Sequence, residues 1–267
     1  MKHIIITGSS RGIGLGLAKS FLDLGCSVSI SGRSEEVLNQ AIIDLEKSYE
    51  KKRIQGIVCD VTQNDDIQKL WNLAIEKYSK VDIWVNNAGQ GQDYKYIWEL
   101  EKDKVRSIVN TNITGLIYGC QVAYNGMAAQ GYGKIFNMEG FGSNGMKRKK
   151  LSVYGTTKSA VTYFTGSFVK EIEKSPVLVG TIAPGMVVTD LLLQPIHKDN
   201  PEYKTTIKVF NLMAEKVEVV TPWLASKMLK SRKQGTSINF SPTWKMMLKA
   251  LKNLITNRSI IPQIEKQ

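Results

Sequence analysis

Short runs rich in β-branched residues alternate with amphipathic stretches along most of this chain of 267 residues. Strands separated by stretches of helical length run parallel, because the chain has to cross back over the sheet between them. Right-handed crossovers place helices on both faces, so the alternation predicts an α/β, doubly wound parallel sheet of about seven strands. We expect strands at His3–Thr7, Ser27–Ser31, Ile54–Val58, Asp82–Val85, Lys134–Met138, Val177–Ile182 and Ser237–Phe240, and helices at Ile13–Leu24, Glu35–Tyr49, Asp65–Tyr78, Glu99–Ala129, Ser152–Glu173 and Val219–Lys230.

The chain shows no internal repeat and no linker rich in Pro and Gly, so residues 1–241 are expected to form a single domain. Residues 186–214 break the alternation and are expected to form a mobile, partly helical insertion. Residues 242–267 read as a basic amphipathic helix and tail. Such a helix packs on its own domain or on a partner subunit, or makes peripheral contact with an anionic membrane.

The formal charge of +12 comes from Lys and Arg residues spread along the whole chain. No signature of a nucleic-acid-binding motif accompanies them, so nucleic acid is not an expected partner, whereas an anionic cofactor or substrate is compatible with this charge. Three isolated cysteines and two histidines lack metal-ligand spacing, which predicts no metal site. No apolar run has the length of a signal peptide or a membrane span, so we expect a cytoplasmic protein without an integral membrane segment.

A glycine-rich turn, TGSSRGIG, joins the first expected strand to the first expected helix. Gly8, Gly12 and Gly14 allow a tight turn and a close approach of the backbone to a pyrophosphate, which the helix N-terminus then binds through its free N–H groups. Where the second strand ends, the sequence SISGRSEE places Arg33 in the position at which an acid would bind an unmodified ribose. Arg33 and Arg11 suit a 2′-phosphate, which favours NADP(H) as the cofactor.

The ordered motifs of this chain resemble those of the short-chain dehydrogenase/reductase family. These motifs are TGSSRGIG, Asp60 in VCDVT, NNAG at Asn86–Gly89, Asn112, Tyr154-x-x-x-Lys158 and Pro184-Gly185. The resemblance implies a Rossmann-type nicotinamide enzyme acting on a small-molecule carbonyl substrate, as a homodimer or homotetramer. It implies that Asp60 holds the adenine, that NNAG lines the cofactor channel, and that Val187 and Thr189 meet the carboxamide. The full expected cofactor set is Gly8, Ser10, Arg11, Gly12, Ile13, Gly14, Arg33, Asp60, Val61, Asn87, Ala88, Gly89, Tyr154, Lys158, Pro184, Gly185, Val187 and Thr189.

Tyr154 and Lys158 lie one helical turn apart, and this pair suits proton transfer. A phenol has an ordinary pKa near 10, and a neighbouring ammonium is expected to lower it, so that Tyr154 acts as a general acid in carbonyl reduction. Asn112 resembles the family asparagine that holds a water in the proton path. Tyr154, Lys158 and Asn112 are therefore expected catalytic residues.

The sequence departs from the family where a serine usually follows the fifth strand, because Glu139 and Gly140 stand there. Ser143 is the expected catalytic substitute. This departure and the C-terminal residues resemble the chlorophyll(ide) b reductase-like branch, which implies reduction of a formyl group on a large tetrapyrrole with NADPH.

Four consecutive cations, residues 147–150, precede Tyr154. They form either a solvated run or an electropositive rim for an anionic substrate or an acidic carrier protein. Alternatives to a general carbonyl reductase are therefore a 3-oxoacyl-[acyl-carrier-protein] reductase and, from another class, a non-catalytic NADP-binding regulator.

Overall fold

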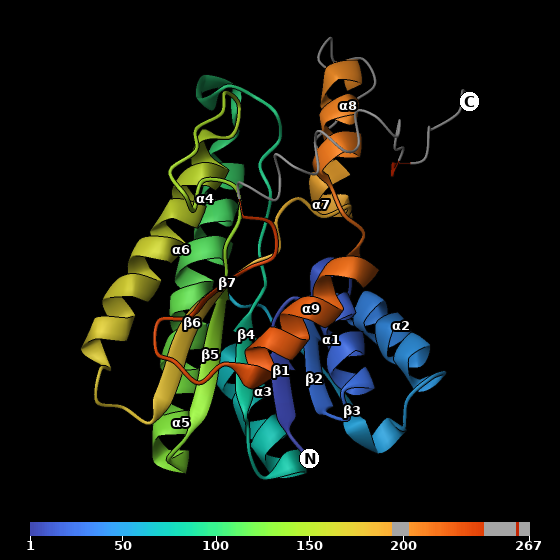
Figure 1. Cartoon of the computed structure of the whole chain (residues 1–267), viewed down its shortest axis with the longest axis vertical. Helices are drawn as coiled ribbons and strands as arrows, with labels where there is room; N and C mark the ends of the chain where they lie inside the picture. Colours follow the sequence, from blue (N-terminus) through green and yellow to red (C-terminus); the bar gives the residue numbers. More distant parts are fainter. Residues whose placement is uncertain (194–202, 243–259, 262–267) are drawn as a thin grey trace.

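The computed structural model describes residues 1–193, 203–242, 260 and 261, and it contains one parallel sheet of seven strands (Figure 1). The strand order is β3-β2-β1-β4-β5-β6-β7, so the direction of winding reverses between β1 and β4. Ligands of such sheets bind outside the carboxyl ends of the strands at this reversal. The strands are β1 (His3–Ile6), β2 (Ser27–Gly32), β3 (Ile54–Val58), β4 (Ile83–Asn86), β5 (Gly133–Met138), β6 (Val177–Ala183) and β7 (Ser237–Asn239). The predicted fold class is confirmed.

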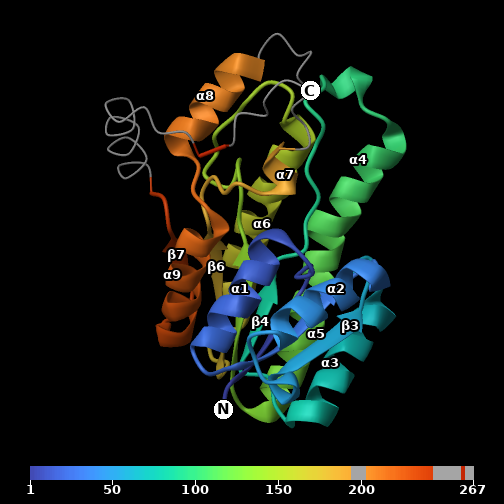
Figure 2. The same ribbon diagram turned by 90° about the vertical axis from the view of Figure 1, so that its right-hand side faces the viewer.

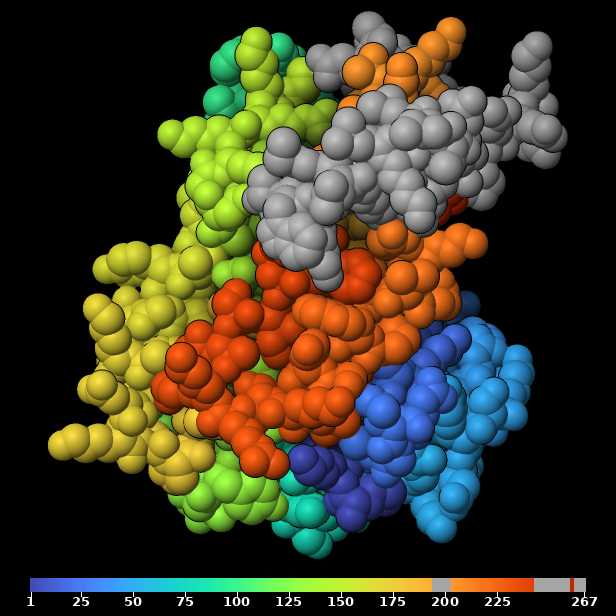
Figure 3. All heavy atoms as spheres, viewed as in Figure 1, coloured from blue at the N-terminus to red at the C-terminus, as the bar shows by residue number. Residues whose placement is uncertain are grey.

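Two layers of helices cover the sheet, as Figures 1 and 2 show from two directions. One face carries α1 (Gly12–Asp23), α2 (Glu35–Glu46) and α9 (Val217–Lys230), and Figure 3 shows the orange residues of α9 directly against the blue N-terminal residues. The other face carries α3 (Asn64–Tyr78), α5 (Gly115–Gln130) and α6 (Ser152–Glu171). Apolar side chains on both faces of the sheet are buried beneath the two helix layers. This packing holds the carboxyl ends of the strands in place.

The prediction of a single helix from Glu99 to Ala129 is wrong. The chain forms a 3₁₀ turn at Ile97–Glu99, then α4 (Lys102–Val109), a π-helical turn at Asn110–Thr114, and α5. The wider turn lies where Gly115 meets the neighbouring loop, since a Cβ added at Gly115 would lie 2.8 Å from the Val61 carbonyl oxygen. Such π-turns occur often at functional sites, and this one contains Asn112.

The segment after β6 rises above the carboxyl ends of the strands and carries α7 (Asp190–Leu193) and α8 (Tyr203–Met213) (Figure 1). Ile260 and Ile261 pack against Phe210 of α8, and both of their N–H groups donate to the Asn211 side-chain oxygen, at 3.0 and 2.9 Å. The amphipathic helix expected in residues 242–267 otherwise lies outside the described residues. Within the described part of the chain, no helix combines the length and apolar character that crossing a bilayer requires.

Candidate active site

The glycine-rich turn is packed directly onto the NNAG segment that follows β4. Thr7 Oγ1 accepts hydrogen bonds from the backbone N–H groups of Asn87 and Ala88, both at 3.1 Å. Gly8 has a φ of +59°, and a Cβ there would lie 2.7 Å from the Ala88 Cα. Only glycine fits this left-handed, close-packed position. The backbones of the glycine-rich turn and of the NNAG segment thus line the reversal point between β1 and β4.

The N-terminus of α1 has the properties of an anion site. Its N-cap residue, Arg11, makes no side-chain capping bond, and its first turn contains no acidic residue. The first N–H groups of the helix therefore remain available, and the helix dipole favours a negative charge beside them. The cradle fits the pyrophosphate of a dinucleotide.

The residues expected around the adenosine lie at the ends of β2 and β3. Arg33 is exposed, and Ser10 lies over Gly32, where a Cβ would be 2.8 Å from the Ser10 hydroxyl oxygen. Asp60 Oδ1 accepts from the N–H and the hydroxyl of Thr62, both at 2.9 Å. These bonds fix the Asp60 carboxylate.

Arg11 was expected to join Arg33 at a 2′-phosphate. In the structure its guanidinium instead forms an exposed ion pair with Asp190 of α7, at 3.6 Å. Asp190 therefore competes with any bound phosphate for the Arg11 guanidinium. Thr189 also lies above the glycine-rich turn, since a Cβ at Gly12 would be 3.6 Å from the Thr189 methyl group. Val187, in contrast, is buried and forms a β-bridge with Glu215. The chain turns into this segment at Gly185, whose φ is +76°.

Asn112 is buried, and its side chain connects three parts of the site. Its Oδ1 accepts from the Gln90 N–H at 2.7 Å, and its Nδ2 donates to the Gln90 carbonyl and the Thr157 hydroxyl, both at 3.0 Å. The side chain therefore holds the loop after NNAG against α6. Its expected role in holding a water stays a prediction.

Tyr154 and Lys158 stand in the first two turns of α6, next to this junction. Lys158 is 4% exposed, its Nζ donates to the Met138 carbonyl at 3.0 Å, and it lies 5.8 Å from the centroid of the Tyr154 ring. A Cβ at Gly89 would be 3.8 Å from the Lys158 Nζ. The structure thus brings the pair together with the NNAG segment at the reversal point of the sheet.

The expected lowering of the Tyr154 pKa is wrong for the protein alone. Burial raises the pKa of Tyr154 to about 12, and the phenol of Tyr94 acts in the same direction. Burial lowers the pKa of Lys158 to about 8, against the opposing effect of the Glu139 carboxylate. Desolvation penalises the charged form of each group, and it is the largest cause of both shifts.

Ser143 does not contact Tyr154. Its hydroxyl donates to the Lys158 carbonyl and accepts from the Gly140 N–H, both at 3.1 Å, so it closes the loop after β5. Gly140 instead faces the phenol, since a Cβ there would lie 2.6 Å from the Tyr154 hydroxyl oxygen and 3.2 Å from the Lys158 Cε. The position expected for a catalytic hydroxyl is therefore filled by Tyr154 itself.

Comparisons with known proteins agree with this geometry. A model of the short chain dehydrogenase family matches residues 2–200. The chain belongs to the short-chain dehydrogenase/reductase family. This membership makes it an oxidoreductase that acts on CH–OH or carbonyl groups.

Two plant members of the family are similar over most of the chain. Chlorophyll(ide) b reductase NOL from Oryza sativa subsp. japonica is 36% identical over 255 residues, which are 94% of this chain and 72% of the relative. Probable chlorophyll(ide) b reductase NYC1 from Arabidopsis thaliana is 34% identical over 90% of this chain, which spans only 50% of that relative. Both are described as chloroplastic, and the cytoplasmic location expected here stays a prediction.

Two more members of the family match less of the chain or share less sequence with it. The 3-oxoacyl-[acyl-carrier-protein] reductase FabG from Chlamydia pneumoniae is 33% identical over 71% of this chain and 75% of its own. The crystal structure of a short-chain type dehydrogenase/reductase from Mycobacterium marinum superposes with a TM-score of 0.78 at 23% identity, over 89% of this chain and 93% of the other, which shows the shared fold.

Several residues that build this short-chain dehydrogenase site were missed by the sequence reasoning. The buried Gln92 accepts a hydrogen bond from the Tyr154 N–H at 3.0 Å and donates to the Lys150 carbonyl at 3.1 Å. Gln90 is held by Asn112, and Tyr94 lies close enough to Tyr154 to influence its pKa. The GQGQDY run carries no spacing that would have distinguished these residues from an ordinary loop.

The four cations before Tyr154 are divided between two environments. The Arg148 guanidinium lies 5.4 Å from the Tyr94 ring centroid, and the Lys150 ammonium lies 5.1 Å from that of Tyr96. Lys147 and Lys149 are exposed and make no ion pair or ring contact with other described residues. The loop is thus partly anchored by cation–π contacts, and two of its charges remain available.

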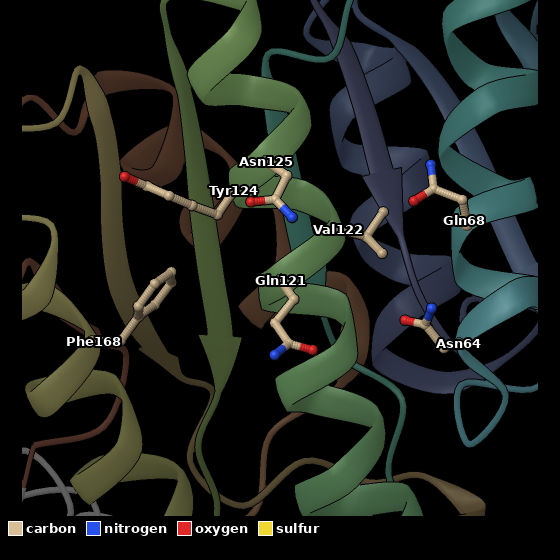
Figure 4. Close-up of a pocket in the computed structure, with 7 residues that line it drawn as sticks. All are labelled: Asn64, Gln68, Gln121, Val122, Tyr124, Asn125 and Phe168. Carbon is tan, nitrogen blue, oxygen red and sulfur yellow. The ribbon is translucent and has the colours of Figure 1, made fainter.

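A surface hollow of about 440 Å³ is lined by residues of α3, α5 and α6 (Figure 4). It is lined by Asn64 and Gln68 of α3, by residues of α5, and by Phe168 of α6, and it contains none of the expected catalytic residues. The described residues also contain no group of three or more His, Cys, Asp or Glu side chains that could hold a metal ion.

Proposed function

We propose that this protein is an NADPH-dependent carbonyl reductase in which Tyr154 donates the proton and Lys158 stabilises the phenolate that remains. One observation carries the proposal: the buried Lys158 lies against the NNAG segment at the reversal point of the sheet, with the half-buried Tyr154 beside it on the same helix. When NADPH is bound, it supplies the hydride. The phenol then gives its proton to the carbonyl oxygen, and the Lys158 ammonium offsets the new negative charge on Tyr154.

The protonation state of Tyr154 favours reduction over oxidation. With a pKa of about 12, the phenol carries its proton at neutral pH, as a general acid must. An alkoxide formed by hydride addition is more basic than a phenolate, so the transfer from Tyr154 is downhill. Alcohol oxidation would need the phenolate at the start, and burial disfavours that form.

The preference for NADPH rests on the charges at the ends of β1 and β2. Arg33 is exposed where β2 ends, and Arg11 lies in the glycine-rich turn, with an ion pair to Asp190 that a phosphate can replace. Charge-assisted forks from guanidinium groups recognise phosphates well, and no carboxylate stands at the end of β2 to repel one. Ser10 adds a hydroxyl over Gly32.

For the substrate class, we propose a formyl group on a large conjugated molecule of the chlorophyll(ide) b type. The support is the 36% identity to chlorophyll(ide) b reductase NOL over 94% of this chain, together with the resemblance of the sequence around Glu139-Gly140 to that branch. Because the chain spans only part of these relatives, their whole activity is carried over here as a proposal.

A second candidate is a 3-oxoacyl-[acyl-carrier-protein] reductase. Lys147 and Lys149 are exposed beside the site and suit an acidic carrier protein. The similarity to FabG covers 71% of the chain and supports the same possibility.

The deciding experiment measures NADPH oxidation with chlorophyllide b, simple aldehydes and ketones, and a 3-oxoacyl carrier protein, for wild type and Tyr154→Phe. We expect turnover of a formyl substrate and a loss of about 10²- to 10⁴-fold in the variant. NADPH binding, followed by cofactor fluorescence, should be equal in both proteins. Tight NADPH binding with no turnover above the Tyr154→Phe level for any carbonyl would overturn the proposal and favour a cofactor-binding regulator.

A further inference from the structure

Lys158 is a buried cation that needs a counter-charge. Its ammonium has three N–H donors, and among the described residues it donates one hydrogen bond, to the Met138 carbonyl. A charge buried to this extent is stable only when it is paired or well solvated by polar groups. The chain places one carboxylate nearby, that of Glu139, the residue that follows Met138.

Glu139 is fixed by the sheet and by α6. Its N–H donates to the Ile182 carbonyl at 2.9 Å, which extends the pairing of β5 with β6 by one residue. Its Oε1 accepts from the Thr162 hydroxyl at 3.0 Å, and Thr162 lies one helical turn after Lys158. The carboxylate is therefore held beside the helix face that carries Lys158, although the two groups do not form a direct ion pair within 4.0 Å.

We propose that Glu139 is a positioning residue that keeps Lys158 charged and thereby lets Lys158 stabilise the Tyr154 phenolate. This inference rests on the proposed function. It gives a role to one of the two residues that stand in the region where the family usually has a serine, and it explains how a lysine so deeply buried can still act as a cation.

The charges around the ammonium support this role. Among the described residues, the titratable groups that face Lys158 are Glu139 after β5 and Tyr154 on α6, while Tyr94 from the loop after β4 faces Tyr154. Burial lowers the pKa of Lys158 to about 8, and Glu139 opposes that effect. Burial likewise raises the pKa of Glu139, which the bonds from the Thr162 and Thr181 side chains and the charge of Lys158 oppose. Each charge thus supports the other.

The first measurement is the pH profile of kcat/KM for carbonyl reduction at saturating NADPH, in Glu139→Gln and in Glu171→Gln. Glu171 ends α6 and is exposed, so its variant removes the same charge away from the site. In Glu139→Gln, the alkaline limb should move to lower pH by about one unit, a loss of about fivefold at pH 8. Glu139→Asp retains the charge and should restore most of the profile, whereas Glu171→Gln should match wild type.

The second measurement is independent of turnover. A lysine whose pKa is lowered in the folded state makes stability rise with pH, from the folded pKa up to the unfolded value near 10.4. In wild type this rise should begin near pH 8, the pKa of Lys158. In Glu139→Gln it should begin about one unit lower. The free energy of unfolding of the full chain, measured by denaturant between pH 6 and 10, reports this shift.

These two measurements separate the possible failures. If Glu139→Gln matches Glu171→Gln in both, the inference is overturned. If no carbonyl is reduced but the unfolding curve shifts, the proposed function falls and the coupling of Glu139 to Lys158 stands. If Glu139→Gln does not fold, Thr162→Val decides, because loss of its hydroxyl weakens the hold on Glu139 and should shift both curves in the same direction by a smaller amount. An unshifted Thr162→Val would then overturn the inference.

Discussion

The Cα of Gly140 lies so close to the Tyr154 phenol that a Cβ added to it would stand 2.6 Å from the hydroxyl oxygen. Real Cβ atoms do not approach an oxygen so closely, so any side chain at residue 140 must displace the phenol or the loop. The tyrosine hydroxyl thus occupies the space in which a second hydroxyl would otherwise hold a substrate oxygen. Glycine at this position is a requirement of the Tyr154 position found here.

Gly140→Ser tests this relationship, because it installs the residue type that the family usually places there. We expect kcat/KM to fall by about 10- to 100-fold, since an ångström-scale displacement of a proton donor has effects of that size. Gly166→Ser, on an open position of the same α6 helix, is the matched control. A rise in kcat/KM for Gly140→Ser would show that the loop accommodates the serine without moving Tyr154.

Arg33→Asp tests the cofactor preference. A carboxylate at the end of β2 repels a 2′-phosphate and binds a ribose hydroxyl, so the Kd for NADPH should rise by about 10- to 100-fold while that for NADH falls or stays constant. Both constants are measured by fluorescence titration. Arg232→Asp, an exposed site after α9, makes the same charge change away from the crevice. Equal weakening of both cofactors by Arg33→Asp would argue against a phosphate contact.

Lys147→Glu combined with Lys149→Glu tests whether the loop before α6 attracts an anionic substrate. Neither lysine contacts a ring, unlike Arg148 and Lys150, so charge reversal leaves the loop anchored. For an anionic substrate, kcat/KM should fall about tenfold at low salt, and its salt dependence should weaken. Lys170 and Lys174, reversed together at the far end of α6, provide the control. Unchanged kcat/KM and salt slope would assign the loop to ordinary solvated surface.

The buried His3 side chain should make the protein less stable in weak acid. Burial, with help from Lys77, lowers the pKa of His3 from 6.5 to about 3. The unfolded chain therefore binds a proton below pH 6.5 that the folded chain refuses, and stability falls as pH decreases towards 3. We expect a loss of about 2 kcal/mol between pH 6.5 and 5, measured by urea unfolding. His3→Gln should remove most of this slope. A wild-type slope that persists in His3→Gln would place the titrating group elsewhere.

The order of the strands and the placement of Tyr154 and Lys158 on one helix were predictable because each depends on local pattern. Short apolar strands bounded by turns specified the sheet, and the spacing of Tyr154 and Lys158 placed both on one helix face. Three-dimensional packing decided what the sequence could not show. The break before Gly115 follows from its contact with Val61, and the direction of the Tyr154 pKa follows from burial. Ser143 was assigned a catalytic role by proximity in sequence, whereas its hydroxyl is bound to the backbone.

The segment after Pro184 contacts both the glycine-rich turn and the loop that follows β4. Asp190 pairs with Arg11 on one side, and on the other a Cβ at Gly91 would lie 3.5 Å from the Leu191 side chain. A dinucleotide bound as proposed would lie beneath this segment, and the carbonyl compound would have to enter above the nicotinamide. Steady-state kinetics should accordingly follow a compulsory order, with the cofactor binding first and leaving last.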